Sequence, residues 1–358
     1  MTPASAARMP KIASVGRALP PYKLSQDDIR EFARIQFSRA ESGWERLLDV
    51  FKNAEISERY FSVPADWYRT PHTFIEKTAE YVRSCDTLGV AAANDCLKRL
   101  HLTADQVDYI IFVSTTGIST PSIDARLINL LGMRSNIRRT PIWGLGCAGG
   151  AAGLSHAYHY LLGHPKERVL IVAIELCGLT FQQNDFSKSN FIATALFGEG
   201  AAAVLMTGDE VETEGVAVLD TRSTFWPDSL DVMGWNVMNT GLQVVFSQSI
   251  PQIVKERAKD NLEGFLGDHK LTLGDIAHFI LHPGGAKVIE AYESALGLVK
   301  GTLAYCRQAL RDFGNMSSVS VLFVLAEHLK QFSLGSGKYG LISALGPGFC
   351  AESLLVRF

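Results

Sequence analysis

The sequence of 358 residues predicts an α/β protein made of two related halves. Short apolar runs typical of buried strands alternate with longer runs typical of helices, which is the pattern of layered α/β folds. The chain is also longer than a single hydrophobic core usually supports, so two structural halves are expected. Finally, two stretches repeat one order of elements: a strand, a long connection, a polar residue in a glycine-bounded turn, a helix and a strand.

The individual elements follow from the apolar pattern. Residues 1–10 contain no apolar centre and are expected to form a loose tail. Apolar runs bounded by turn residues predict strands, and longer mixed runs predict helices. The predicted strands are 107–115, 168–175, 201–208, 276–282 and 339–346, and the predicted helices are 85–100, 148–162, 248–266 and 317–332.

The repeat aligns polar residues of the two halves. In the first half a strand ends near residue 114, and Cys147 follows 33 residues later at the start of a helix. In the second half a strand ends at His282, and Asn315 follows 33 residues later, again before a helix. All three stand in glycine-bounded turns (LGCAGG, HPGG and GNMSS), and we therefore infer an internal duplication.

Composition excludes several classes of function. With 47% hydrophobic residues, 20% charged residues and a net charge of −3, the chain has no general attraction to nucleic acid or anionic membranes. No apolar run reaches the ~18 residues that a membrane helix needs. The six cysteines form no Cys-x-x-Cys pair, so we expect free thiols in a reducing cytoplasm. His156 and His159 have no further ligand nearby, and no metal site is predicted.

Cys147 has two possible interpretations. A thiol at a helix N-terminus beside an imidazole becomes a nucleophile when its pKa falls. Alternatively, Cys147 is a buried residue in a tight contact, because the following Ala148, Gly149 and Gly150 let another element or a substrate approach the helix.

His282 and Asn315 also have structural alternatives. His282 can be a plain strand-end residue, and Asn315 an ordinary helix N-cap. If Ser317 or Ser318 caps instead, the amide of Asn315 stays free. Together with Cys147 they suggest a Cys/His/Asn site, in which the imidazole stabilises the thiolate and both groups donate hydrogen bonds to an oxyanion. No general-base carboxylate is expected beside these turns.

At these residues the sequence resembles the type III polyketide synthases, the chalcone-synthase-like members of the thiolase superfamily. The resemblance covers residues 11–358 and implies a thiolase-like αβαβα layered fold from two duplicated halves, 11–220 with the nucleophile and 221–358 with His and Asn. HPGG together with GNMSS favours this family over the ketosynthase III-type condensing enzymes, which share the fold and the site. The motifs are GLGCAGG (144–150), ALFGEGAAAVL (195–205), HPGG (282–285), GNMSS (314–318) and GPG (346–348).

The resemblance implies an acyltransferase that condenses acyl-CoA with malonyl-CoA. Cys147 would accept the acyl group, and His282 and Asn315 would support malonyl decarboxylation. Phe197 would separate the CoA tunnel from the cavity, although core packing is its alternative role. The CoA thioesters are substrates, and no metal or redox cofactor is implied. A homodimer is implied as well, with the segment 121–127 reaching the partner's cavity.

The resemblance also implies which residues surround the substrates. Small side chains at Thr120 and Val244 favour a long-chain fatty acyl-CoA as the starter, two or three malonyl extensions and an alkylpyrone product. The alternatives are an alkylresorcinol synthase, an enzyme with an aromatic starter, and a binding or redox-sensing protein with a reactive Cys147. Trp235, Ala344 and Leu345 depart from an open cavity or from the usual loop. The expected cavity residues are Thr115, Thr120, Cys177, Thr180, Ala193, Leu242, Val244 and Ser317, and the expected CoA-binding residues are Arg46, Lys52 and Lys287.

Overall fold

The computed structural model describes residues 9–38, 44–331 and 334–358, so most of the predicted tail lies outside the described residues. Its strands are β1 (Lys11–Ala18), β2 (Tyr22–Ser25), β3 (Glu58–Phe61), β4 (Tyr109–Val113), β5 (Arg138–Ile142), β6 (Arg168–Leu176), β7 (Glu199–Thr207), β8 (Val216–Phe225), β9 (Met233–Met238), β10 (Gly241–Phe246), β11 (Ile276–Leu281), β12 (Tyr339–Gly346) and β13 (Cys350–Arg357). Its α-helices are α1 (Gln26–Phe37), α2 (Asp49–Asn53), α3 (Phe74–Lys98), α4 (Ile123–Leu131), α5 (Gly149–Gly163), α6 (Lys188–Leu196), α7 (Ile250–Asp268), α8 (Ala286–Leu296), α9 (Ala304–Phe313) and α10 (Ser318–Gln331). Short 3-10 turns include η4 (Gly146–Ala148) and η5 (Cys177–Thr180).

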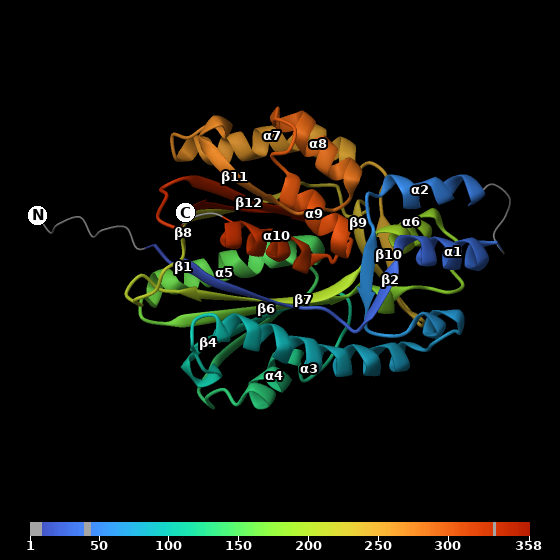
Figure 1. Ribbon diagram of the computed structural model, residues 1–358, viewed down its shortest axis with the longest axis horizontal. Helices are drawn as coiled ribbons and strands as arrows, with labels where there is room; N and C mark the ends of the chain where they lie inside the picture. Colours follow the sequence, from blue (N-terminus) through green and yellow to red (C-terminus); the bar gives the residue numbers. More distant parts are fainter. Residues whose placement is uncertain (1–8, 39–43, 332–333) are drawn as a thin grey trace, which may run out of the picture.

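The elements stack in five layers of helices and strands (Figure 1). Helices α7 and α8 cover strands β11 and β12, helices α5 and α10 fill the middle, strands β6 and β7 follow, and α3 and α4 cover the opposite face. The αβαβα layering expected from the resemblance is therefore confirmed.

The sheet order displays the duplication. The nine-stranded sheet runs β11-β12-β13-β8-β1-β7-β6-β4-β5. In one half β4 is parallel to β6, and β6 and β1 are both antiparallel to β7. In the other half β11 is parallel to β12, and β12 and β8 are both antiparallel to β13. Since β4 corresponds to β11, the helices that follow the polar turns, α5 and α10, also correspond and pack against each other in the central layer.

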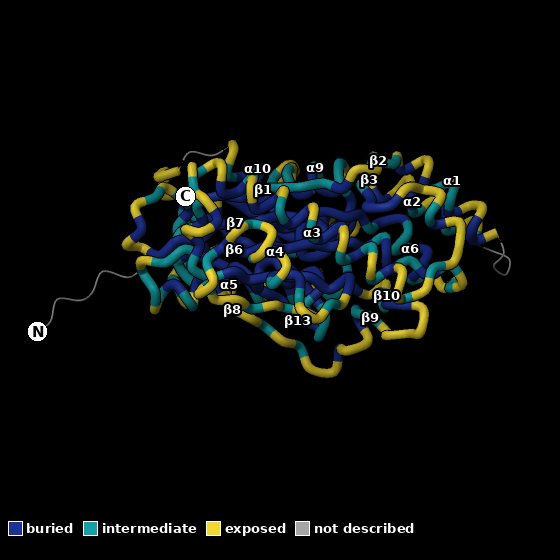
Figure 2. Tube along the Cα trace, turned by 90° about the horizontal axis from the view of Figure 1, so that it is seen from below, coloured by how far each residue is buried: buried dark blue, intermediate teal, exposed yellow. Residues whose placement is uncertain are grey.

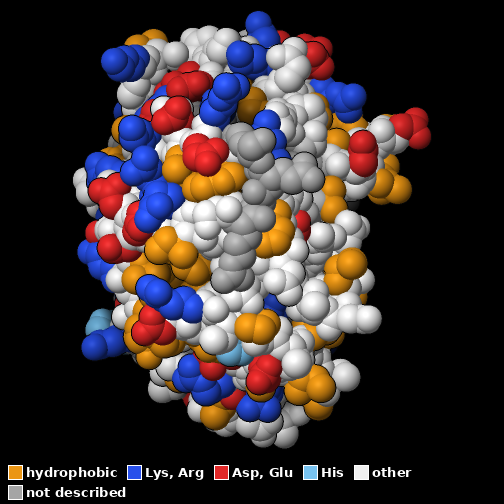
Figure 3. All heavy atoms as spheres, turned by 90° about the vertical axis from the view of Figure 1, so that its right-hand side faces the viewer, with side chains coloured by type: hydrophobic (Ala, Val, Ile, Leu, Met, Phe, Trp, Pro, Cys, Tyr) orange, Lys and Arg blue, Asp and Glu red, His pale blue; other side chains and the backbone are white. Residues whose placement is uncertain are grey.

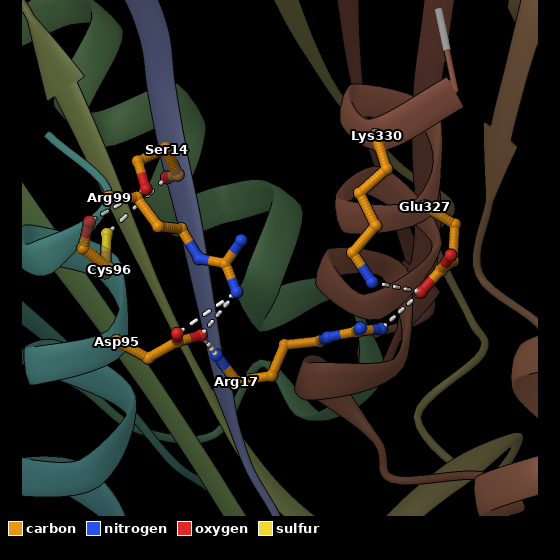
Figure 4. Close-up of polar contacts among 7 residues, drawn as sticks. All are labelled: Ser14, Arg17, Asp95, Cys96, Arg99, Glu327 and Lys330. Carbon is orange, nitrogen blue, oxygen red and sulfur yellow. Dashed lines mark hydrogen bonds and ion pairs between the residues drawn. The ribbon is translucent and has the colours of Figure 1, made fainter.

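Strand β1 ties the layers together although it is the first strand of the chain (Figure 4). The Arg17 amide donates to Asp95 Oδ2 of α3 at 3.0 Å, and Arg17 Nη1 lies 2.6 Å from Glu327 Oε1 of α10. Ser14 Oγ donates to the Cys96 carbonyl at 2.9 Å. The outer helix α3 and the central helix α10 are thus held to the same strand.

Buried residues form a continuous band through the centre of the molecule, with exposed residues concentrated at its rim (Figure 2). Strands β6 and β7 are almost wholly buried, as expected for strands covered by helices on both faces. In the part of the chain that the structure describes, no helix is long and apolar enough to cross a membrane.

Candidate active site

Cys147 lies in the turn η4, between β5 and α5, and only 8% of it is exposed. Gly144 and Gly146 on either side of Leu145 have φ angles of +94° and +47°, a conformation that residues with a Cβ rarely adopt. The Gly146 amide donates to Thr115 Oγ1 at 3.0 Å. The glycines therefore turn the chain sharply and present the thiol at the N-terminus of α5.

The glycines inside α5 serve a different purpose, because other elements approach the helix there. A Cβ on Gly150 would lie 2.2 Å from the Ser318 carbonyl oxygen of α10, and a Cβ on Gly153 would lie 2.9 Å from Ile171 of β6. The small residues after Cys147 thus admit α10 and the sheet.

His282 follows β11, and its amide donates to the Ser343 carbonyl of β12 at 2.9 Å. Both ring nitrogens are buried, and neither has a hydrogen-bond partner among the described residues. Burial lowers the pKa of His282 to about 4, so the imidazole is neutral at physiological pH. A neutral imidazole with no partner is free to exchange protons and hydrogen bonds with a substrate.

Asn315 connects the other two residues. Its Nδ2 donates to the Gly284 carbonyl at 3.1 Å, and a Cβ on Gly284 would lie 3.5 Å from the His282 ring. The Asn315 side chain also lies within hydrogen-bonding reach of the Cys147 thiol. Asn315 therefore lies beside the Cys147 thiol and is bonded to the turn that follows His282.

The Asn315 amide is less free than the sequence indicates. Its Oδ1 accepts from the Ser317 amide at 2.8 Å, so Asn315 itself caps the turn before α10. Ser318 Oγ donates to Glu175 instead, at 2.6 Å. Since Nδ2 carries two hydrogens and gives one to Gly284, the other is left for the Cys147 sulfur or a ligand beside it.

The Cys147 thiol is protonated at rest. Burial raises its pKa to about 12, while hydrogen bonds to the Ser317 and Asn315 side chains lower it and the charge of Glu175 raises it further. The positive end of the α5 helix dipole acts in the opposite direction, because it stabilises the thiolate and so lowers the pKa of Cys147. A nucleophilic role for this sulfur would therefore require a proton acceptor, and His282, whose imidazole is neutral, is the candidate base.

Glu175 is a residue of this site that sequence reasoning missed. Its carboxyl group is fully buried at the end of β6 and accepts hydrogen bonds from the Thr115 amide (3.0 Å), Thr116 Oγ1 (2.9 Å) and Ser318 Oγ (2.6 Å). Burial raises its pKa to about 7, and these hydrogen bonds lower it in part. The sequence does offer one signal for a buried Glu175, because it is the only carboxylate in the largely apolar run RVLIVAIEL.

Phe197 ends α6 beside the same turn. Its backbone forms a bridge with Asn315, and its ring contacts the rings of Trp235 and Phe246 at centroid distances of 6.4 and 6.1 Å. The indole of Trp235 thus packs against Phe197 and supports this wall.

A cavity of about 90 Å³ lies on one side of α6, lined mostly by apolar side chains. Of the expected cavity residues, it is lined by Cys177, Thr180, Ala193 and Val244, together with Phe197. The cavity extends from the buried Cys177, which is electrostatically coupled to Cys147, to the exposed Asp28 at the start of α1.

The remaining expected cavity residues lie elsewhere. Thr115 supports the nucleophile turn, and Ser317 lies beside the Cys147 thiol. Leu242 is buried and does not line this cavity, and Thr120 is exposed on the loop before α4. Leu345 lines a separate small cavity under α7, away from the wall formed by Phe197.

A second cavity, of about 400 Å³, lies on the other side of α6 and reaches Gly284 and Gly285 beside the site. Arg46 and Lys287, two of the expected CoA-binding residues, line it together with Lys188. Lys52 does not line it, whereas Asp49 and Asn53 do.

The surface around this second cavity carries both signs of charge. Figure 3 shows the end of the molecule with α1 and α2, where Lys and Arg side chains are interspersed with Asp and Glu. This end of the molecule therefore has no uniformly positive face in this view.

Two protein-family models and several known proteins match this chain. The family model of the chalcone and stilbene synthase N-terminal domain matches residues 3–210, and that of the C-terminal domain matches residues 218–358. The chain is 42% identical to a Bacillus subtilis (strain 168) protein named "Putative chalcone synthase", covering 96% of this chain and 97% of that protein. It is 38% identical to the 1,3,6,8-tetrahydroxynaphthalene synthase of Streptomyces peucetius subsp. caesius, covering 97% and 93%.

Solved structures agree in fold. The 1,3,6,8-tetrahydroxynaphthalene synthase of Streptomyces coelicolor A3(2), a bacterial type III polyketide synthase, superposes with a TM-score of 0.91 at 26% identity, covering 97% of this chain and 99% of that chain. PKS-I of the brown alga Ectocarpus siliculosus superposes with a TM-score of 0.89 at 26% identity, covering 99% of both chains.

Proposed function

This chain belongs to the chalcone and stilbene synthase family, as a type III polyketide synthase and thus an acyltransferase, and from that premise we propose its starter, its product and the roles of its site residues. The proposed reaction joins a long-chain fatty acyl-CoA to two or three malonyl-CoA units and releases an alkylpyrone. The observation that carries the proposal is the Cys147 thiol beside Asn315, with a cavity on each side of α6.

Loading begins when Cys147 attacks the thioester carbonyl of acyl-CoA. The thiol proton passes to the neutral His282, a sulfur–carbon bond forms to Cys147, and the bond to the CoA sulfur breaks. His282 then returns the proton to the departing CoA thiolate.

Chain extension uses the side chains of His282 and Asn315. The carboxylate of malonyl-CoA leaves as CO2, and its bonding electrons form the enolate of acetyl-CoA. His282 and the free hydrogen of Asn315 Nδ2 donate hydrogen bonds to the enolate oxygen. The enolate carbon attacks the acyl thioester, the bond to Cys147 breaks to leave a thiolate, and a chain longer by two carbons leaves on CoA. The Cys147 thiolate then attacks the new CoA thioester, which reloads the chain and releases CoA as its thiolate, and the next extension begins. Lactonisation, in which an enol oxygen attacks the terminal thioester, releases CoA and the pyrone.

The acyl tail is proposed to occupy the cavity lined by Ala193 and Val244. Its lining is predominantly apolar, and each buried methylene contributes about 0.8 kcal/mol. The opening at Asp28 offers space beyond the enclosed volume for a tail of greater length. On the opposite side of α6, Arg46, Lys188 and Lys287 line the second cavity, and they are proposed to bind the CoA phosphates.

A second candidate is a synthase of a small phenolic ring. The curated relatives include enzymes named for 1,3,6,8-tetrahydroxynaphthalene and phloroglucinol, neither of which carries an alkyl tail. The modest enclosed volume of about 90 Å³ favours this candidate. Closure to an alkylresorcinol or use of an aromatic starter would differ from both in product mass.

The chain is also proposed to form a homodimer through the surface before α4. The apolar side chains Ile118 and Trp143 are 43% and 50% exposed there, and Trp143 Nε1 donates to the Gly117 carbonyl at 3.1 Å. Thr120 is exposed on the same loop.

Product mass tests the proposed reaction. Purified protein is incubated with malonyl-CoA and acyl-CoAs of graded length, and mass spectrometry identifies starter, extensions and ring type. Long-chain pyrones support the proposal; products from aromatic starters alone, or from malonyl-CoA alone, contradict it. Cys147→Ala should lose the covalent acyl adduct and all chain extension but retain binding of acyl-CoA, since the two cavities stay intact.

A further inference from the structure

Arg59 of β3 is a buried cation without a carboxylate partner. Only 1% of the residue is exposed, and among the described residues its guanidinium contacts carbonyl and amide oxygens but no acidic side chain. An unpaired buried charge is destabilising, and proteins retain one where its hydrogen bonds serve a purpose. The contacts of Arg59 identify that purpose.

The guanidinium holds the C-terminal end of α6. Arg59 Nη1 donates to the Thr194 and Phe197 carbonyls, each at 2.8 Å, and Nη2 donates to Gln26 Oε1 at 2.8 Å. Gln26 in turn donates through Nε2 to the Ala195 carbonyl at 3.0 Å. These carbonyls have no helical partner and form the negative end of the helix dipole, where a cation is favourable.

The same end of α6 is bonded to the catalytic asparagine. The Asn315 amide donates to the Leu196 carbonyl at 2.8 Å, and the Gly198 amide donates to the Asn315 carbonyl at 2.9 Å. The stem of Arg59 also packs against Gly314, where a Cβ would lie 2.7 Å from Arg59 Cδ. Arg59 therefore contacts both strands of this short backbone pairing, one carrying Phe197 and the other Asn315.

We infer that Arg59 is a positioning residue, whose guanidinium fixes the end of α6 and, through it, the side chains of Phe197 and Asn315. The inference rests on the proposed role of Asn315 in malonyl decarboxylation. A displacement of about 1 Å in such a group lowers a rate by roughly 10²-fold. Loss of the guanidinium should therefore slow decarboxylation while leaving the thiol accessible, since Arg59 makes no contact with Cys147.

The test compares Arg59→Met and Arg59→Lys with the wild-type enzyme. For Arg59→Met we expect a lower kcat for the conversion of malonyl-CoA to acetyl-CoA, expressed per Cys147 thiol that iodoacetamide labels. The kcat should fall roughly 10- to 10²-fold, and KM should stay within about threefold of the wild-type value. Arg59→Lys keeps the positive charge but loses the planar guanidinium group. Its kcat should therefore lie between those of Arg59→Met and the wild-type enzyme. Gln26→Ala should lower kcat in the same way but by less. It replaces Arg59→Met in the test if that variant does not fold.

Hydrogen–deuterium exchange supplies a readout that does not need activity. Loss of Arg59 should accelerate exchange in residues 195–199 and 313–317 together, because their amides are bonded to each other. The control is Arg17→Met, which removes an arginine that bridges β1 and α10 without touching either turn. A wild-type enzyme that does not decarboxylate malonyl-CoA contradicts the proposed function alone, and exchange then decides the inference. Unchanged exchange, or a decarboxylation rate per labelled Cys147 equal to wild type, overturns the inference.

Discussion

The Glu199 carboxyl group lies fully buried at the start of β7, and burial raises its pKa to about 8. Its Oε2 accepts from the Ser62 amide at 2.6 Å, while Oε1 has no partner among the described residues. Between the ordinary pKa near 4.5 and about 8, the unfolded chain releases this proton and the folded protein retains it. Stability should therefore fall as the pH rises through that window.

Glu199→Gln removes this titration, and the amide still accepts from Ser62. We expect the variant to be more stable than wild type at pH 8.5, on the order of 1–3 kcal/mol, with the gain vanishing near pH 4.5. Urea unfolding followed by circular dichroism across this pH range measures the difference. Parallel stability curves for the two proteins would rule out a proton held by Glu199.

At the level of single residues, the sequence singled out three polar turn residues but not the side chains that surround them. Cys147, His282 and Asn315 could be found because glycine-bounded turns and equal spacing mark them. Glu175 could not, because its contact with the site depends on how Ser318 and Thr115 fold around it. Burial also sets the pKa of Cys147 in the opposite direction from the expected lowering, and burial is a property of the folded chain.

Helix α6 is a partition with two chemically different faces. Asn190, Ala193 and Thr194 line the apolar cavity, whereas Lys188, Ile192 and Leu196 line the cavity with the rim cations. These spacings of three and four residues are those of two opposite helical faces. One helix therefore separates the proposed acyl and CoA subsites.

The two faces predict separable effects on the kinetics. Ala193→Phe should shift the preferred starter to shorter acyl-CoAs, by about fourfold in kcat/KM for each methylene that no longer fits. Ile192→Trp, its matched control on the other face, should raise KM for all CoA substrates by a similar factor whatever their length. Kinetics over a series of acyl-CoAs measure both. Loss of length discrimination in both variants would contradict the partition.

Close contact between α5 and α10 makes the glycines of α5 unequal. A Cβ on Gly150 would meet the Ser318 carbonyl oxygen, whereas a Cβ on Gly163 would meet nothing within 4 Å. Gly150→Ala should destabilise the fold by about 2–3 kcal/mol, and Gly163→Ala should be neutral or stabilising by up to about 1 kcal/mol. Thermal and urea denaturation measure both. Equal effects would show that α10 can move away from α5.

Elements of the inner layers were predictable because burial on both faces makes their sequences continuously apolar. Strands β6 and β12 match their expected ranges within one residue. Helix α3, by contrast, begins at Phe74, well before the predicted 85, because a capping box of Thr73 and Glu76 starts a helix whose first turns are polar. The hairpin β9–β10 was missed because most of its side chains are partly or fully exposed, so it shows no continuous apolar run.

At the scale of the whole molecule, the proposed homodimer makes one prediction. Trp143→Glu places a charge in the exposed apolar surface before α4 and should convert a particle of twice 39.2 kDa into a monomer. Val299→Glu, at a site that is 78% exposed elsewhere, should leave the assembly unchanged. Analytical ultracentrifugation measures the mass. A monomeric wild-type protein, or a dimeric Trp143→Glu, would contradict this surface.

Both ends of the described chain lie inside the nine-stranded sheet. Strand β1 sits between β7 and β8, and the last strand, β13, sits between β8 and β12. Strand β8 follows its neighbour β1 by some two hundred residues of chain, and β13 comes later still. During synthesis β1 therefore stays without its neighbour β8, and β8 without β13, until those segments have been made, and proteolytic removal of Lys11–Ala18 or Cys350–Arg357 would break the same strand pairings in the folded protein.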